Sequence, residues 1–199
     1  MIYIVEGVAG SGKDTLCSQI VRSLRPEERR VLVFPEEAVL ATWLYYFVPG
    51  IHQTRLDLTE HLVSYMHETL ASDPDAAFVL NRFHVSHAVW RAELKADTPA
   101  LEERHRRLVD SMRSLPLRIF QTLLPEANAD ARASHLERRD RAWEAFLAQR
   151  VAFHGEASAG QSYLSQQDAM TAVLQSDGLP YRPVTVPLGE EIDIEALWS

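Results

Sequence analysis

The sequence predicts one α/β domain built on a doubly wound, parallel sheet of five strands. The chain has 199 residues, which suits a single domain with a substantial core. Short runs rich in β-branched and aromatic residues alternate with longer stretches whose apolar residues recur at helical spacing. A glycine-rich turn joins the first such run to the first helix. Strands separated by helices pair in parallel, and ligands bind at the carboxyl ends of such strands.

Five short runs bounded by turn residues are the predicted strands. They are residues 2–5, 31–34, 77–80, 118–124 and 181–186. Helices are predicted between them, because residues such as Leu16, Ile20 and Leu24 recur every four positions. The segment 36–47 is apolar nearly all round, so a helix there would be buried on several sides or would form an interface. Its aromatic cluster, Trp43, Tyr45, Tyr46 and Phe47, suits the core or a homodimer surface, and a base-stacking platform is the alternative.

Composition excludes several classes of protein. Apolar residues make up 46% of the chain and charged residues 24%, unlike disordered or collagen-like chains. The longest apolar run, 38–48, has about half of the ~20 residues that span a bilayer, so no membrane association is expected. The start of the chain does not resemble a secretory signal, and the single Cys17 lacks a disulfide partner, so a cytoplasmic location is expected. The net charge of −8 disfavours general binding of nucleic acid.

The turn after the first strand carries the pattern of a phosphate-binding loop. It reads Gly-Val-Ala-Gly-Ser-Gly-Lys from residue 7 to residue 13, between a predicted strand and a predicted helix. Glycines let successive N–H groups point inward around phosphate oxygens, and Lys13 would lie against the β- and γ-phosphates. The sequence therefore predicts binding of ATP by Gly7, Gly10, Ser11, Gly12, Lys13, Asp14 and Thr15.

Asp14 occupies the position where such loops carry a Ser or Thr that ligates Mg²⁺. A carboxylate is a good ligand for a hard cation, so Asp14 is the predicted metal ligand, directly or through water. Thr15 is expected to bond the α-phosphate. The form Gly-Lys-Asp-Thr resembles the loop of some phage deoxynucleoside monophosphate kinases.

The third strand distinguishes among proteins with this loop. It ends in Val-Leu-Asn-Arg at residues 79–82, without the Asp-Glu pair of motor-type ATPases, and the chain has no Asn-Lys-x-Asp guanine-binding motif of GTPases. Residues 81–90, Asn-Arg-Phe-His-Val-Ser-His-Ala-Val-Trp, resemble the Asp-Arg-Tyr-x-x-Ser-x-x-Ala-Tyr segment of thymidylate kinases. Residues 4–7, residues 123–126 and the arginine-rich stretch with its following helix are similar to the same family, so the resemblance spans about the first 155 residues.

The resemblance implies a nucleoside monophosphate kinase fold with an arginine-rich, mobile lid at about 132–150. It also implies that Arg82 contacts the transferring phosphoryl group or the acceptor, and an arginine paired with a surface carboxylate is the alternative. Arg138 and Arg141 would act from the lid as a clamp on the phosphoryl oxygens, and a solvated basic helix face is the alternative.

Two departures bear on the acceptor. Asn81 replaces the aspartate of the family, and Ala9 replaces an acid that contacts the acceptor sugar, so the acceptor need not be dTMP. Residues 34–37, Phe-Pro-Glu-Glu, also resemble the Pro-Glu-Pro of deoxynucleoside kinases, in which the glutamate takes the proton of the attacking hydroxyl. Glu36 is therefore a candidate general base, and an ordinary carboxylate at a helix start is the alternative.

These features predict an ATP- and Mg²⁺-dependent kinase formed by a single domain, 1–199. Its predicted acceptor is a deoxynucleoside monophosphate. Its predicted partners are such nucleotide or nucleoside substrates, with a second copy of the chain in a homodimer as a further candidate. One alternative is a kinase of a hydroxyl group on a deoxynucleoside or a hydroxymethylated base, with DNA a substrate only in that modified form. The alternative from another class is an inactive, nucleotide-binding regulatory protein.

Overall fold

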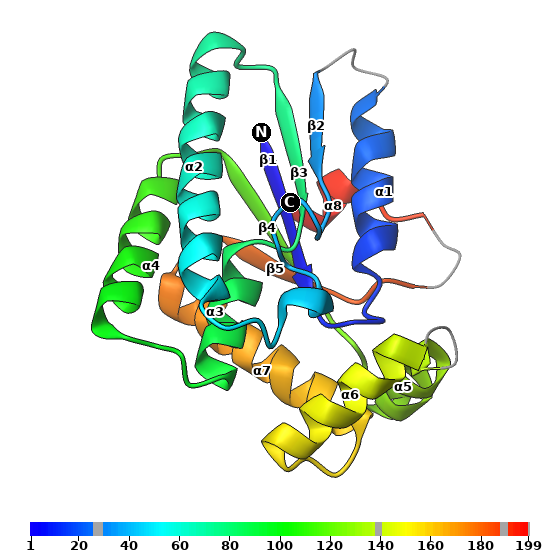
Figure 1. Cartoon of the computed structure of the whole chain (residues 1–199). Coiled ribbons are helices and arrows are strands. Elements are labelled where there is room, and N and C mark those ends of the chain that lie inside the picture. Colours follow the sequence, from blue (N-terminus) through cyan, green and yellow to red (C-terminus); the bar gives the residue numbers. More distant parts are fainter. Residues whose placement is uncertain (26–29, 138–140, 188–190, 199) are drawn as a thin grey trace.

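The computed structural model describes residues 1–25, 30–137, 141–187 and 191–198, and it contains the expected sheet (Figure 1). All of its strand pairs are parallel, and the strand order is β2-β3-β1-β4-β5. The first strand therefore lies at the centre, between β3 and β4. The strands are β1 (Ile2–Gly7), β2 (Val31–Phe34), β3 (Ala77–Asn81), β4 (Leu117–Thr122) and β5 (Tyr181–Val184).

Helices cover both faces of the sheet (Figure 1). On one face α1 packs against α8, and on the other α2, α3, α4 and α7 form a thicker layer. Both α5 and α6 lie beyond the carboxyl ends of the strands. The helices are α1 (Lys13–Leu24), α2 (Ile51–Ser72), α3 (His84–Glu93), α4 (Pro99–Met112), α5 (Ala129–Glu137), α6 (Arg141–His154), α7 (Ala159–Asp177) and α8 (Ile194–Trp198), with short 3-10 helices η2 (Trp43–Tyr45) and η3 (Glu126–Asn128).

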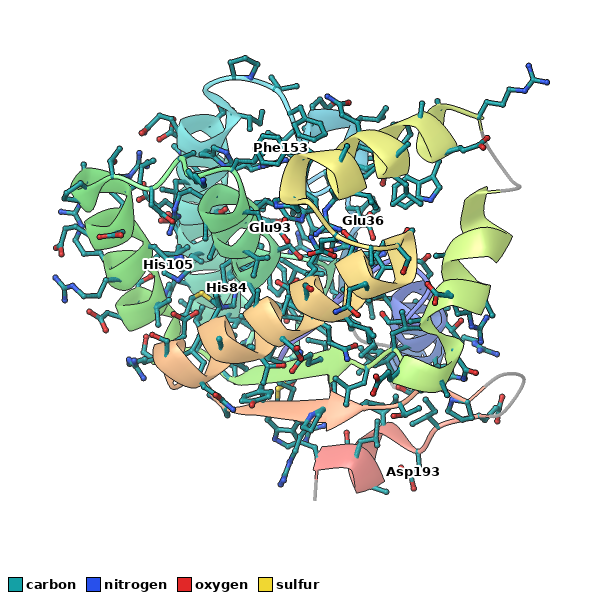
Figure 2. The ribbon with its side chains drawn as sticks, turned by 90° about the horizontal axis from the view of Figure 1, so that it is seen from below. Glu36, His84, Glu93, His105, Phe153 and Asp193 are labelled. Carbon is teal, nitrogen blue, oxygen red and sulfur yellow. The ribbon has the colours of Figure 1, made fainter. Side chains whose placement is uncertain are left out.

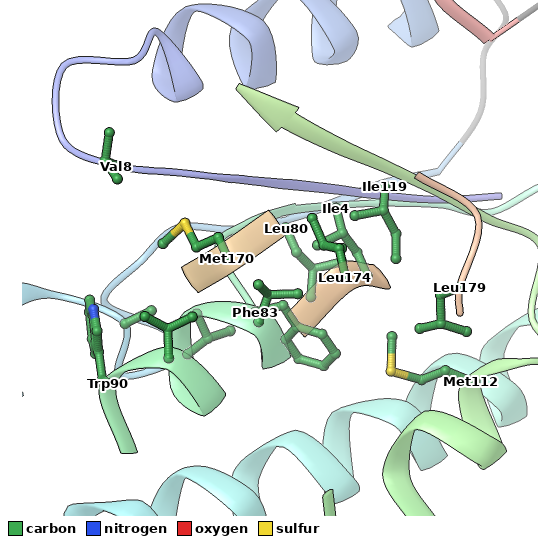
Figure 3. Close-up of a cluster of buried hydrophobic side chains, with 14 of the residues drawn as sticks. Ile4, Val8, Leu80, Phe83, Trp90, Met112, Ile119, Met170, Leu174 and Leu179 are labelled. Atoms are coloured by element: carbon green, nitrogen blue, oxygen red, sulfur yellow. The ribbon is translucent and has the colours of Figure 1, made fainter. Parts of the chain in front are cut away.

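The central strand β1 is buried along its whole length, and its side chains alternate between two cores. Tyr3 and Val5 face α1 and α8, whereas Ile2 and Ile4 face the thicker helical layer. Figure 3 shows the second core, in which Ile4 lies among side chains from β3, β4 and α7. Because both faces are apolar, the sheet is anchored on both sides and its carboxyl edge is held in a fixed position.

The segment 36–47 is not an α-helix. It forms turns that end in η2, and Leu40 adopts a left-handed conformation with φ 54°. One such residue interrupts the regular hydrogen bonding of a helix. The segment is nevertheless largely buried, because Val39, Ala41 and Tyr46 belong to the core of the thicker layer. The element boundaries elsewhere differ from the sequence-based ones by a few residues.

Membrane-spanning helices are not found in the described part of the chain, since no helix there is both long and apolar enough to cross a bilayer.

Candidate functional site

The glycine-rich loop of residues 7–13 joins β1 to α1, which is the place in the fold that the sequence predicts for it. Gly12 precedes α1 with a left-handed φ of 95°, which an L side chain rarely adopts. A Cβ on Gly7 would lie 2.1 Å from the Thr122 hydroxyl, so only glycine allows this close approach to β4. Ser11 is buried, and its hydroxyl donates to the Val8 carbonyl at 2.8 Å. A second hydrogen bond of 2.6 Å, between the Ser11 and Thr122 hydroxyls, ties the loop to β4.

Lys13 lies at the start of α1, and its ammonium group is buried in an ion pair. Its Nζ lies 3.1 Å from Glu36 Oε1 and 3.5 Å from the carbonyl oxygen of Val8. The same carboxylate oxygen accepts a hydrogen bond of 3.0 Å from Arg82 Nε. One carboxylate oxygen thus joins three parts of the fold: the start of α1 (Lys13), the segment after β2 (Glu36) and the turn after β3 (Arg82).

Glu36 is held as a carboxylate by this arrangement. Burial by itself raises the pKa of Glu36, but the positive charges of Arg82 and Lys13, together with their hydrogen bonds, outweigh burial and lower it to about 2. Its side chain remains 23% exposed, so one side of the carboxylate faces the cavity described below.

Asp14 and Asn81 form a second polar pair at the same edge of the sheet. Asn81 Nδ2 donates to Asp14 Oδ1 at 2.6 Å. Its carbonyl oxygen, Oδ1, is buried and has no hydrogen-bond partner among the described residues. A carboxylate and an amide oxygen without a donor are ligands that Mg²⁺ accepts, usually together with water and substrate phosphates. These two residues therefore fit the predicted cation.

One cavity of about 310 Å³ extends from the glycine-rich loop into an aromatic region. Small-molecule sites typically measure ~300–1,000 Å³, so the cavity suits one ligand of small size. At the loop end it is lined by Lys13, Asp14, Glu36 and Arg82. The opposite end is lined mainly by large side chains from η2, α3, α6 and α7: Trp43, Tyr46, Trp90, Trp143, Phe146, Arg150, Tyr163 and Gln166.

A buried polar network around Glu93 supports the aromatic end. Glu93 accepts hydrogen bonds from Arg150 (2.7 Å), Tyr46 (2.6 Å) and the side-chain amide of Gln166 (3.2 Å). Since a carboxylate is only an acceptor, Gln166 must turn its amide nitrogen toward Glu93 and its carbonyl oxygen away. Figure 2 shows Glu36 and Glu93 near the centre of the face that carries α6 and α7.

The structure brings together only part of the predicted site. Lys13, Asp14, Glu36 and Arg82 line one cavity. Thr15 is exposed on the first turn of α1. Arg141 is exposed at the start of α6 and does not line the cavity, and Arg138 lies outside the described residues. The arginine-rich lid therefore remains a prediction.

Sequence reasoning missed the contributions of α6 and α7. Trp143, Arg150 and Gln166 carry no motif, because helical periodicity gives the buried face of a helix without saying which cavity it borders. It also assigned no role to Glu6, although a carboxylate within an otherwise apolar strand is itself a signal.

No protein-family model and no curated protein sequence matches this chain. Solved structures do match it. The YorR protein of Bacillus subtilis, solved in complex with phosphorylated GDP, superposes with a TM-score of 0.59 at 12% identity, over 92% of this chain and 85% of that one. A deoxyadenosine kinase from M. mycoides, solved with dCMP and dCDP, superposes with a TM-score of 0.48 at 12% identity, over 99% and 94%.

At such low identity a structural match establishes the fold alone. The fold class predicted from the sequence is confirmed: a five-stranded parallel sheet flanked by helices.

Proposed function

We propose that this protein transfers the γ-phosphoryl group of ATP to a nucleotide-type acceptor bound in the aromatic end of the cavity, and that the acceptor is a deoxynucleoside monophosphate. One observation carries the proposal. The phosphate-binding loop, the cluster of Lys13, Glu36 and Arg82, and the aromatic region border a single cavity. A donor on the loop and a flat acceptor among the aromatic rings would meet at that cluster, in the proximity that phosphoryl transfer needs.

Lys13 and Arg82 would serve the transferring group. Glu36 already holds both cations at the junction, before any phosphate is bound. Lys13 would exchange its contact with Glu36 for the phosphates of the donor. Arg82 would then face the charge that develops on the equatorial oxygens.

Asp14 and Asn81 are the residues that would hold Mg²⁺. A cation held there would supply positive charge to offset that of the phosphates. The carboxylate of Asp14 lies beside the donor site, and its negative charge is unfavourable near phosphates unless a cation is bound.

Support for a monophosphate acceptor comes from the resemblance of residues 82–88 to thymidylate kinases and from the basic residues of the cavity. The cavity is lined by three basic residues, Lys13, Arg82 and Arg150, and by two acidic ones, Asp14 and Glu36. A bound Mg²⁺ and the predicted lid arginines would add the positive charge that two nucleotides require.

A hydroxyl acceptor is the second candidate, and the position of Glu36 favours it. The carboxylate lies between the donor loop and the aromatic region, where an attacking hydroxyl would have to lose its proton. The acceptor would then be a deoxynucleoside or a hydroxymethylated base.

ADP release measured against deoxynucleosides, their monophosphates, and DNA with and without hydroxymethylated bases separates these candidates. We expect turnover with a monophosphate, and Lys13→Ala protein prepared in the same way controls for contaminating kinases. Turnover on a nucleoside or a modified DNA would favour the hydroxyl candidate instead. Binding of ATP without turnover on any acceptor would favour a regulatory protein.

Glu36→Gln distinguishes the two acceptors chemically. A monophosphate is already ionised at neutral pH, so we expect less than about a 10-fold loss of turnover at saturating Mg²⁺. A hydroxyl-directed enzyme that loses its general base should slow by roughly 10²–10⁴-fold with ATP binding unchanged. A loss above ~10²-fold therefore contradicts the monophosphate proposal.

A further inference from the structure

Arg82 has a strained backbone at the point where β3 turns into α3. Its φ is 65°, in the left-handed region that residues other than glycine rarely adopt. Such strain persists only where the surrounding structure enforces it. The Arg82 N–H is bonded to the carbonyl of Val5 at 2.9 Å, which fixes the residue to β1 but not the direction of the chain after it.

Glu6 supplies the contacts that fix the next residues. It lies on β1 and is fully buried, and its Oε1 accepts hydrogen bonds from the backbone N–H groups of Phe83 (2.8 Å) and Val85 (3.2 Å). A carboxylate is favourable at this place, because the first N–H groups of α3 lack partners within the helix. The N-cap residue, Phe83, does not cap these N–H groups with its own side chain.

The second oxygen of Glu6 connects to the Arg82 side chain. Its Oε2 accepts from the Ser86 hydroxyl at 2.5 Å, and that hydroxyl in turn accepts from Arg82 Nη1 at 3.2 Å. Arg82 Nε then donates to Glu36. The ring of Trp90 lies beneath the guanidinium, 5.6 Å from its carbon. A continuous series of contacts thus leads from the core of the sheet to the cavity.

We infer that Glu6 is a positioning residue, which acts through α3 and the Ser86 hydroxyl to aim the guanidinium of Arg82 at the phosphoryl-transfer junction. The inference rests on the proposed function only for what Arg82 does there. How Arg82 is held depends on contacts within the protein. The carboxylate itself does not line the cavity.

Three variants test the inference on the full-length protein. Glu6→Gln keeps the size of the side chain but replaces one acceptor oxygen by a donor. Ser86→Ala removes only the link between Glu6 and Arg82, so it stays informative if Glu6→Gln folds poorly. Thr171→Val is the matched control, because it severs a hydrogen bond of 2.7 Å from Gln121 between β4 and α7, away from the cavity.

The first measurement needs no substrate. Hydrogen exchange of the Arg82 Nε–H group is followed by nitrogen-15 NMR, with the signal assigned by its loss in Arg82→Lys. We expect exchange at least about 10-fold faster in Glu6→Gln and Ser86→Ala and unchanged in Thr171→Val, because the guanidinium loses its support on the Ser86 side and its bond to Glu36 opens more often. Unchanged exchange in both test variants would overturn the inference, even if the protein transfers no phosphoryl group at all.

The second measurement is a double-mutant cycle in turnover, with ATP as donor and dTMP and thymidine as parallel acceptors. If Glu6 acts through Arg82, Glu6→Gln lowers kcat roughly 10-fold in the wild-type background and less than about 2-fold in the Arg82→Ala background. The KM for ATP should stay the same, since the phosphate-binding loop is untouched. Equal losses in the two backgrounds would show a general structural role and would contradict the inference.

Discussion

At the scale of single residues, the site depends on one carboxylate that holds two cations. Glu36 Oε1 lies 3.1 Å from Lys13 Nζ and 3.0 Å from Arg82 Nε. Without Glu36 the two positive charges would repel each other, because both side chains are buried and water screens them little. With the proposed nucleotide bound, its phosphates would take over part of this role. The residues are therefore poised for a ligand that brings negative charge to the same point.

Lys13→Ala should abolish phosphoryl transfer and leave the fold intact. Glu36 keeps its contact with Arg82 in this variant, so no buried charge is left without a partner. We expect a loss of turnover of at least ~10²-fold, as for removal of one donor to a transition state. Thermal unfolding checks the fold and ADP release checks the activity. Unchanged turnover would contradict the proposed function as a whole.

Asp14 should govern the requirement for Mg²⁺. In Asp14→Ala the Asn81 amide loses its partner and the cation loses a ligand, so we expect half-maximal turnover to need about 10-fold more Mg²⁺. Asp14→Ser restores the hydroxyl ligand found in most such loops and should retain most of the activity. Wild-type behaviour of both variants across a magnesium titration would place the metal elsewhere.

The residues of the site differ in how far the sequence could predict them. The loop is a continuous motif, and Glu36 and Arg82 follow the ends of parallel strands, which meet at one edge of a sheet. Arg150 and Gln166 were not predictable in this way. Their place in the cavity depends on how α6 and α7 cross the sheet edge, and nothing in the local sequence specifies that angle.

At the scale of elements, α6 is attached to the rest of the domain by a buried ion pair. Arg150 lies on α6 and Glu93 on the last turn of α3, and the Arg150 side chain is only 3% exposed. The sequence predicts a mobile lid from about 132 to 150. The buried ion pair holds Arg150, the last residue of that range, in the wall of the cavity. Any movement of a lid is therefore confined to residues that precede Arg150 in the sequence, unless the ion pair breaks.

Breaking the ion pair on one side should be costly. Glu93→Gln leaves the Arg150 charge buried without its carboxylate, and we expect the free energy of unfolding to fall by about 3–5 kcal/mol. Adding Arg150→Met removes the remaining charge, so the double variant should lose less than the sum of the two single losses. Urea denaturation of the four proteins measures this coupling. Strictly additive losses would mean that the pair does not anchor α6.

The segment 36–47 shows why elements were less predictable than the fold class. Its apolar residues are compatible with a buried helix, and the structure buries them without one. Tertiary contacts of Tyr46 with Trp90 and Phe146, and its hydrogen bond to Glu93, fix the segment instead. The spacing of apolar residues predicts a helix when one face of the segment packs against a single sheet or helix. Here the segment packs against α2, α3 and α6 and also borders the cavity.

At the scale of the whole molecule, the thicker helical layer buries three histidines. His52, His84 and His87 lie on α2 and α3, and Figure 2 shows His84 and His105 side by side, apart from Glu36. Burial lowers the pKa of His52 and His84 to about 4 and that of His87 well below its ordinary value. The histidines are therefore neutral in the folded protein and pack as core residues, with Asp177 facing His84 at 3.6 Å.

These histidines should make the fold sensitive to mild acid. In the unfolded chain each has an ordinary pKa near ~6.5, so between that pH and about 4 the unfolded state binds more protons than the folded state. The free energy of unfolding should consequently fall as the pH drops below ~6.5, by up to about 1.4 kcal/mol per pH unit for each histidine. Burial raises the pKa of Glu6 above its ordinary value of 4.5, so between 4.5 and the raised pKa this group acts in the opposite direction.

Urea denaturation at several pH values between 7 and 5 measures this slope, and His84→Gln and His87→Gln assign it. Each variant lacks one group that must take up a proton on unfolding, so its slope should be smaller by roughly 1.4 kcal/mol per pH unit once the pH is well below ~6.5. His61→Gln is the control, because His61 is exposed on α2. If both buried variants keep the wild-type slope, the histidines are already protonated in the folded protein and a different group sets its response to acid.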